Sequence, residues 1–219
     1  MATARSYFYY LDAHGNLFPV TDIKGLIDGT NIPAGPIQLR DRAFLDFFYL
    51  RLKRSDVEDA AACSNVSGRR EEGELLLHSG AKLTPQEVVQ HFPYVSICGP
   101  ERNFLKAEEA PLVFVNYTFG HPKCKQQNGT LAFGESLWED FQPQALVVTR
   151  EGKLFHPITK LKNLIATQNG AGDAVPRGLV EAQVVKKLGL ELVCDSAKSG
   201  YYVLEWKGQK QRIPYFDEL

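Results

Sequence analysis

Apolar residues along most of the chain either alternate with polar ones or gather in short runs, a pattern that predicts more strands than helices. The aromatic-rich run at 7–11 and the run at 16–20 flank a turn containing Gly15, which predicts a β-hairpin. Further strands are predicted at 92–98, 103–107, 111–119, 131–133, 145–149, 153–155, 201–206 and 211–214.

Three segments carry the period of an amphipathic helix. The segment 42–52 would place four apolar side chains on one helical face, namely Phe44, Phe47, Phe48 and Leu52. We expect this helix to seal the core. Thr84 and Glu87 frame a proline and form a capping-box pattern, which predicts a short helix that runs to about His91. A third helix is predicted near 180–188.

Two segments of the chain resemble each other. Residues 15–27 and 152–165 share the turn glycine, a Leu-Phe pair, a proline, a threonine and the apolar positions of the following helix, with His156 as the single extra residue. Such a match predicts a duplicated structural unit. We therefore expect an α+β fold, in which antiparallel sheets and a repeated hairpin-plus-helix unit pack around one core.

The length of 219 residues, of which 44% are hydrophobic, is enough for one sizeable core. We expect a single domain over residues 1–219, with sub-units at about 1–142 and 143–219. Residues 55–86 are polar, small and charged without sustained periodicity, and this composition predicts a surface insertion.

The charge balance narrows the range of partners. The chain has 25 Lys and Arg against 26 Asp and Glu, so it lacks the positive field that attracts a phosphate backbone. We expect no DNA partner, and RNA contact is disfavoured. No apolar run is long enough to span a bilayer and the first residues have no apolar signal core, which predicts an intracellular protein without a membrane span. The four scattered cysteines fit a reducing compartment.

Glu101, Arg102 and Asn103 concentrate a carboxylate, a guanidinium and an amide after a predicted strand and a Gly-Pro turn. Arg102 is suited to hold a carboxylate or phosphate by two parallel hydrogen bonds, Asn103 can donate and accept, and Glu101 can take a proton. These residues are therefore a candidate binding site. The alternative is an ordinary turn in which Arg102 pairs with Glu108 or Glu109.

Two further residues are candidates. His156 follows the Leu-Phe pair of the second hairpin and is either a proton-transfer group or a structural histidine. Tyr10 belongs to an aromatic run that is typical of the stacking surfaces of single-stranded RNA binders, although strand aromatics also fill cores. The five histidines lack metal-ligand spacing, and the chain has no phosphate-binding glycine loop and no nucleophile elbow. We predict no metal and no cofactor.

Several runs carry a resemblance to a known family. Residues 7–18, 92–105, 110–114, 141–143 and 152–157 resemble uncharacterised protein family 0598, which is domain-of-unknown-function family 4505. A fainter likeness in the glycine hairpin, the aromatic helix and the repeat is to the bacterial domain-of-unknown-function family 1285. That likeness implies an α+β fold with a signalling or ligand-binding role. Animal members of the first family look mitochondrial, so the resemblance implies a mitochondrial location, with the cytoplasm as the alternative. Neither resemblance supplies a catalytic residue.

The sequence therefore predicts a non-catalytic ligand-binding or adaptor protein whose partner is an unknown protein or a small anionic ligand. Its site would lie near Arg102 and Asn103. One alternative is an enzyme in which Glu101, Arg102 and His156 act as acid, anion clamp and base, which requires the three to converge in one pocket. Another is an RNA-associated protein, which requires Tyr9 or Tyr10 to be exposed.

Overall fold

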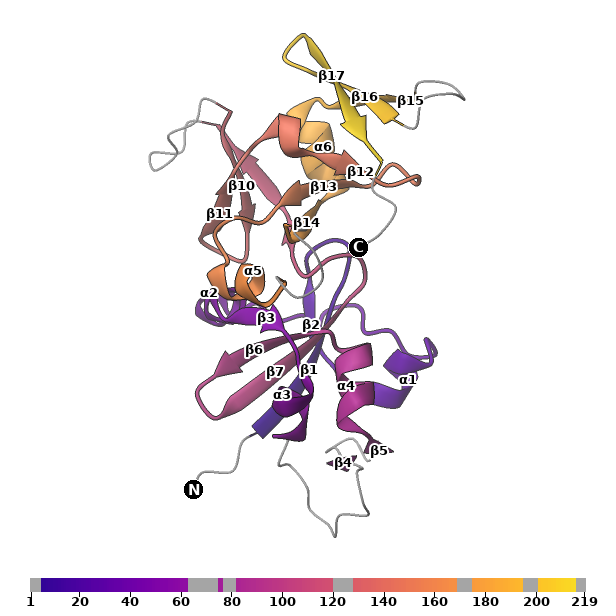
Figure 1. The fold of residues 1–219 in the computed structure, drawn as a ribbon, viewed down its shortest axis with the longest axis vertical. Helices are drawn as coiled ribbons and strands as arrows, with labels where there is room; N and C mark the ends of the chain where they lie inside the picture. The colour runs from indigo at the N-terminus through magenta and orange to yellow at the C-terminus, as the bar shows by residue number, and fades with distance from the viewer. Residues whose placement is uncertain are drawn as a thin grey trace.

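The computed structural model describes residues 5–62, 75–76, 82–119, 128–168, 175–194 and 201–215. These residues form helices and mostly antiparallel sheets, so the α+β prediction is confirmed. The strands and helices within residues 5–107 make the lower part of the molecule in Figure 1, and the strands from residue 113 onwards make the upper part. The chain passes from one part to the other after residue 107, whereas the division into sub-units at 142/143 remains a prediction.

The lower sheet has the strand order β2-β1-β7-β6-β3. Its strands are β1 (Arg5–Leu11), β2 (Leu17–Pro19), β7 (Glu101–Ala107), β6 (Tyr94–Cys98) and β3 (Leu52–Arg54). The pair β1 and β7 is parallel, and the other pairs are antiparallel. Apolar side chains of α2 (Arg42–Leu50) pack on one face, and those of α1 (Ile23–Ile27), α3 (Val57–Ala61) and α4 (Pro85–His91) pack on the other. Strands β4 (Leu75–Leu76) and β5 (Lys82–Leu83) form a separate pair.

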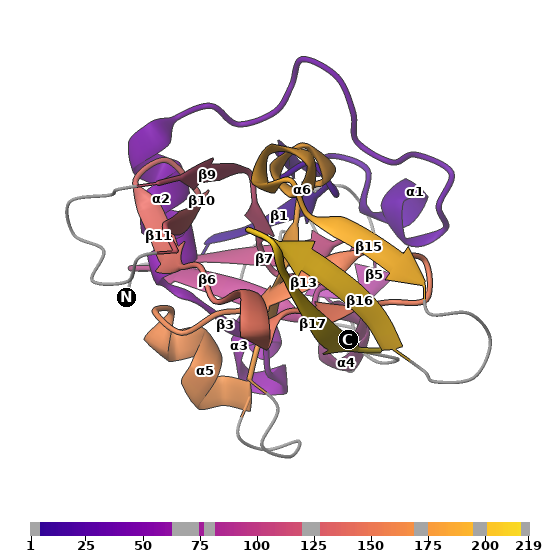
Figure 2. The ribbon, with the colours of Figure 1, turned by 90° about the horizontal axis from the view of Figure 1, so that it is seen from above.

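The upper part contains three small sheets. One comprises β11 (Leu137–Asp140), β10 (Thr130–Phe133) and β9 (Asn116–Thr118), and the second comprises β12 (Val147–Val148), β13 (Leu154–Pro157), β14 (Arg177–Val180) and β8 (Val113–Phe114). The third comprises β15 (Glu191–Cys194), β16 (Tyr201–Trp206) and β17 (Gln209–Pro214). Helices α5 (Lys162–Gln168) and α6 (Ala182–Leu188) and the 3₁₀ turn η1 (Pro143–Ala145) connect them. The β16–β17 hairpin lies at the upper end of Figure 1 and faces the viewer in Figure 2.

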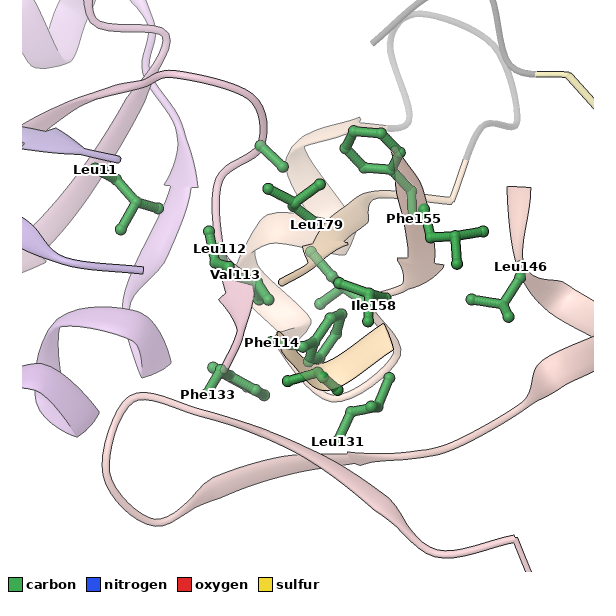
Figure 3. Close-up of a cluster of buried hydrophobic side chains, with 14 of the residues drawn as sticks. Leu11, Leu112, Val113, Phe114, Leu131, Phe133, Leu146, Phe155, Ile158 and Leu179 are labelled. Atoms are coloured by element: carbon green, nitrogen blue, oxygen red, sulfur yellow. The ribbon is translucent and has the colours of Figure 1, made fainter. Parts of the chain in front are cut away.

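One apolar cluster joins the two parts of the molecule. It includes Leu11 of β1, Phe48 of α2, Phe114 of β8 and Phe155 of β13, all of which are fully buried. Figure 3 shows Leu112, Val113 and Phe114 between Leu11 on one side and Leu131, Ile158 and Leu179 on the other. Because this cluster is continuous, each part buries apolar surface that the other would leave in water.

The helix predicted over 42–52 is shorter than expected. It ends at Leu50, and Leu52 is buried in strand β3 instead of the last helical turn. Phe47, which was expected on the buried face, is 39% exposed and lies under the guanidinium of Arg51 at 3.5 Å from the ring centroid. The buried residues of α2 are Phe48 and Tyr49, because the helix is rotated to point this pair at the core.

The beginning of the predicted insertion contains structured residues. Helix α3 has a capping box made by Asp56 and Asp59, and its Ala60 is fully buried. Ser55 donates a hydrogen bond of 2.7 Å to the carbonyl oxygen of Phe92, next to α4. Ala60 belongs to a second apolar cluster, which also contains Val88 and Phe92, so the stretch 55–61 packs against α4. Residues 63–74 and 77–81 of the predicted insertion lie outside the described residues.

The two similar segments both form hairpins that are followed by a short helix. Leu11 pairs with Leu17 in the first hairpin and Val148 with Leu154 in the second, and each turn has a glycine at positive φ, Gly15 at 82° and Gly152 at 80°. The hairpins join their sheets differently. The first strand, β1, pairs with the neighbouring β7, whereas in the other hairpin it is the second strand, β13, that pairs with β14. Duplication of the whole unit remains a prediction, which superposition of 7–27 on 145–165 tests.

The two turn glycines allow a matched test of the local structure. A Cβ at either position is strained by the positive φ, which costs on the order of 1–2 kcal/mol. A Cβ on Gly15 would also lie 2.4 Å from Cγ1 of Val115, whereas one on Gly152 would meet nothing within 4 Å. We predict that Gly15→Ala lowers the unfolding free energy by about 1 kcal/mol more than Gly152→Ala does, as measured by urea denaturation. Equal losses would mean that Val115 does not hold the first turn.

Candidate functional site

The predicted binding residues at 101–103 lie in a strand. The turn consists of Gly99 and Pro100, and Glu101 already begins β7. The alternative of an ordinary turn through these residues is therefore wrong, and the strand predicted from 103 begins two residues earlier. Asn103 is 1% exposed, and its Nδ2 donates a hydrogen bond of 3.2 Å to the carbonyl oxygen of Ser96 on the neighbouring strand. The Asn103 amide therefore ties β7 to β6.

The sheet separates Arg102 from its two neighbours in sequence. Successive side chains of a strand point to opposite faces, so Glu101 and Asn103 share the face of Leu105, and Arg102 shares the face of Phe104. The Nε atom of Arg102 is buried and has no hydrogen-bond partner among the described residues. The structure therefore does not bring the three predicted residues together at one point.

The aromatic run of β1 is mostly buried. Tyr9 and Tyr10 are 8% and 6% exposed, and the hydroxyl of Tyr10 donates a hydrogen bond of 3.2 Å to Oε2 of Glu108. Burial, together with the nearby Glu108 carboxylate, raises the pKa of Tyr10 well above its ordinary value. Neither ring presents a face to solvent, so neither can stack on a nucleic-acid base.

His156 is a buried histidine with both ring nitrogens occupied. Its Nε2 accepts a hydrogen bond of 3.0 Å from the backbone N–H of Gln142, and Nδ1 lies 2.8 Å from the carbonyl oxygen of Pro157, to which it donates in the matching tautomer. Burial lowers the pKa of His156 to about 4. The ring lies edge-on to Phe114, at 5.5 Å between centroids. His156 therefore supports the upper core as a neutral group.

The two glycine turns converge on one cavity of about 290 Å³. The first turn contributes Ala13 and His14, the second contributes residues 151–154, and the segment from Leu179 to Val185 closes the cavity from β14 and α6. Six of the lining residues are apolar, namely Ala13, Leu154, Leu179, Val180, Ala182 and Val185. The cavity therefore joins a compact apolar surface to the polar ends of both hairpins.

Glu181 is the most buried charged residue in this lining. Only 11% of its side chain is exposed, since the residue lies between the end of β14 and the first turn of α6. Oε2 caps α6 by accepting a hydrogen bond of 2.6 Å from the backbone N–H of Gln183, and Oε1 lies 3.3 Å from Nδ1 of His14. His14 has a side chain that is 73% exposed. The Oε1 atom is thus close to a group that can move into solvent.

Two adjacent carboxylates connect the hairpins next to this cavity. Oε2 of Glu108 accepts hydrogen bonds from the Tyr10 hydroxyl and from the Ala13 backbone N–H, at 3.2 and 2.9 Å. Glu109 accepts from Nζ of Lys153 at 2.5 Å, and this hydrogen bond raises the pKa of Lys153. Because the two glutamates are neighbours in the chain, they fix the first turn relative to the second. The predicted pairing of Arg102 with either glutamate is replaced by these contacts.

The charges of the lining favour a cation. Glu151 and Glu181 are carboxylates, and the ammonium of Lys153 is already paired with Glu109. A carboxylate with little exposure next to apolar walls can bind an ammonium group through a charge-assisted hydrogen bond. The arrangement can therefore hold a small molecule with an apolar body and a positive head.

Sequence reasoning did not find Glu181, His14 or Lys153. A signal was present for two of them, because His14 and Lys153 flank the turn glycines of the similar segments. Glu181 carried no comparable signal, since only the fold brings it within 3.3 Å of His14, which is 167 positions away in the chain.

The described residues contain no group of three or more His, Cys, Asp or Glu side chains placed to hold a metal ion. Among the helices that the structure describes, none has both the length and the apolar character to cross a membrane.

Comparison with known proteins gives one family. A family model described as a domain of unknown function, DUF4505, matches residues 80–215. No solved structure matches the chain. The matched range contains Glu108, Glu109, Lys153 and Glu181, while His14 and the first turn precede it. The fainter resemblance to family 1285 receives no support.

The buried His156 predicts a pH dependence of stability. The unfolded chain binds a proton on this histidine at a pKa near 6.5 and the folded chain only near 4. The unfolding free energy should therefore fall as the pH is lowered from 6.5 towards 4, by about 2 kcal/mol at pH 5. We predict that His156→Gln is less stable at pH 7.5 but has a flatter dependence between pH 7.5 and 5 in urea denaturation.

Phe155→Leu is the matched control, because it removes buried apolar volume next to His156 without removing a titratable group. It should lower the unfolding free energy by the same amount at both pH values. A steep dependence in His156→Gln equal to that of the unmodified chain would contradict the assignment.

Proposed function

The chain belongs to the DUF4505 family, and because that description names no activity, we propose from the cavity that it is a non-catalytic binding protein for a small amine. The ligand has a compact apolar body and one primary ammonium group. The mitochondrial location implied by the family resemblance belongs to this proposal, with the cytoplasm as the alternative.

The size and lining of the cavity support a small ligand. Ligand sites are concave, mostly apolar and equipped with a few polar groups that fix orientation. The volume of about 290 Å³ is at the lower end of such sites, and the apolar walls come from β13, β14 and α6. A short branched or linear hydrocarbon chain would bury its surface against Leu154, Leu179 and Val185.

The single observation that carries the proposal is the position of the Glu181 carboxylate. It is almost fully buried, it lines the cavity, and among the described residues its Oε1 has only the exposed His14 ring as a side-chain partner, at 3.3 Å. An ammonium group in the cavity can take the place of that ring and form a shorter hydrogen bond. Turning His14 outwards costs little, because exposed ion pairs contribute little to stability.

The enzyme alternative receives less support than binding. Its three residues were Glu101, Arg102 and His156, and none of them lines this cavity. His156 is buried and held neutral in the upper part, whereas the other two lie in β7 of the lower sheet. Binding without chemistry therefore fits the arrangement better.

A second candidate function is retained for one specific observation. The buried Nε of Arg102 lacks a hydrogen-bond partner among the described residues. A buried donor without a partner is costly, and an anionic ligand or a partner carboxylate would remove that cost. We therefore keep the small anionic ligand, or an acidic segment of a partner protein, as a proposal for the face of the sheet that carries Arg102.

Glu181→Gln tests the amine proposal. Glutamine keeps an oxygen that can cap α6 but removes the negative charge. We predict that isopentylamine binds the unmodified chain and that the substitution weakens this binding about 10-fold or more, the loss expected for a hydrogen bond to a charged group. Isothermal titration measures both affinities. Isovalerate, of similar shape and opposite charge, should bind neither protein.

Glu205→Gln is the matched control. Glu205 is a carboxylate of β16 that pairs with Lys210 at 3.3 Å and does not line the cavity. This variant should keep the affinity of the unmodified chain for isopentylamine. Tighter binding of isovalerate than of the amine, or equal effects of the two substitutions, would exclude the proposal.

Arg102→Lys tests the second candidate. Lysine keeps the charge but removes the planar fork needed for two-point recognition of a carboxylate or phosphate. We predict that recovery of a co-purifying anionic species falls while the melting temperature changes by only a few degrees. Cys63→Ser, in the predicted insertion, serves as the control. Unchanged recovery from the lysine variant would return Arg102 to a structural role.

A further inference from the structure

A second cavity, of about 400 Å³, lies at the turn of the β16–β17 hairpin. It is lined by Phe119, Asn128, Trp206, Lys207 and Gln209. Phe119 follows β9 and Asn128 precedes β10, so the cavity lies where two sheets of the upper part meet. None of these described lining residues is a carboxylate, in contrast to the cavity next to Glu181.

Two aromatic rings define the shape of this cavity. Trp206 packs against Phe141, with the two rings edge-on at 5.3 Å between centroids. Phe119 is 67% exposed, so most of its ring surface is open to solvent. Two aromatic rings of this kind are suited to hold a flat aromatic group by stacking. A nucleic-acid base is such a group, because every base has a flat face on which an aromatic ring can stack.

Lys207 occupies the space over both rings. Its Nζ lies 4.3 Å from the centroid of Trp206 and 4.9 Å from that of Phe119. Both rings therefore turn a face towards the same point. A cation over an aromatic ring at an exposed position is held weakly, so a flat group that stacks on the rings can displace the ammonium. Lys207 then remains next to the cavity as a cation for a phosphate.

The backbone at Lys207 is unusual. Its φ is 51°, the only positive value of a non-glycine residue in the part of the chain that the structure describes. With Gly208 at 74°, it forms a two-residue turn of a kind that commonly has asparagine at the first position. A lysine here costs conformational strain, and such strain is frequent at binding sites. The turn places Lys207 among the lining residues of the cavity.

The remaining polar groups are neutral amides. The side chains of Asn128 and Gln209 each offer a donor and an acceptor. Among the described residues, neither side-chain amide has a hydrogen-bond partner. Paired donors and acceptors of this kind match the hydrogen-bonding edge of a base. An amine would find no carboxylate among the lining residues that the structure describes, and a purely apolar ligand would leave both amides unpaired.

We propose that this cavity binds a nucleotide. The base stacks on Trp206 and Phe119, the amides of Asn128 and Gln209 bind its edge, and Lys207 binds the phosphate. The same chemistry is offered by a free mononucleotide and by a nucleotide of single-stranded RNA. This site is independent of the proposed amine cavity, with which it shares no lining residue.

The fluorescence of Trp206 reports on this site directly. The chain has two tryptophans, so Trp138→Phe leaves Trp206 as the only indole. Adenosine and uridine monophosphates and an eight-residue oligouridylate are titrated into that variant. We expect saturable quenching. Saturation by a mononucleotide identifies a free nucleotide as the ligand, and saturation by the oligouridylate alone identifies single-stranded RNA.

Two substitutions in the same background test the assignment of the residues. Phe119→Ala removes an exposed ring and should weaken binding about 5- to 100-fold, the range for one stacked base. Lys207→Gln should weaken binding and reduce its dependence on salt. The matched control is Phe47→Ala, which removes another exposed phenylalanine that lies under a cation, Arg51, on helix α2.

Absence of quenching with all three probes would overturn the proposal. So would quenching that Phe119→Ala leaves unchanged, or a loss in Phe47→Ala equal to that in Phe119→Ala.

Discussion

The arrangement of the molecule depends on two neighbouring carboxylates that bind different hairpins. Glu108 holds the first turn through Tyr10 and the backbone of Ala13, and Glu109 holds the second through Lys153. The chain crosses between the lower and upper parts at this point, directly after β7. Because the two contacts start from consecutive residues, the turns have little freedom to move apart. The cavity between them is therefore a consequence of how the two parts are joined.

The apolar core reinforces this junction. Residues 110–114 follow the two glutamates directly, and Leu112, Val113 and Phe114 enter the cluster that contains Leu11 below and Phe155 above. Removal of the junction would leave apolar surface of both parts in water. The polar contacts therefore determine the relative position of the hairpins, while the buried apolar surface supplies most of the stability.

Local structural features could be predicted from the sequence. The hairpin around Gly15 and the capping box of Thr84 and Glu87 are both present in the structure, because each depends on residues a few positions apart. The end of α2 was predicted two residues too late, since Leu52 has an apolar side chain that suits a strand as well as a helix. The prediction that Phe47 lies on the buried face was also wrong, because periodicity alone does not fix the rotation of a helix about its axis.

The candidate site could not be predicted from residues that are close together in the sequence. Glu101, Arg102 and Asn103 looked like a cluster because they are adjacent, yet a strand directs neighbouring side chains to opposite faces. Glu181 and His14 meet only through the fold. The similar segments contained a usable signal, since His14 next to the first turn glycine and Lys153 next to the second both line the cavity. The hypothesis that the two turns lie next to each other would have identified His14 and Lys153 as candidate site residues.

The central claim is that both turns form one site, and amide chemical shifts test it most directly. In a titration of the isotope-labelled chain with isopentylamine, the backbone amides of His14 and Lys153 should shift together and fit one dissociation constant. The amide of Gln183, which donates to Glu181, should follow the same curve. Shifts confined to one turn, or different dissociation constants for the two turns, would contradict the account.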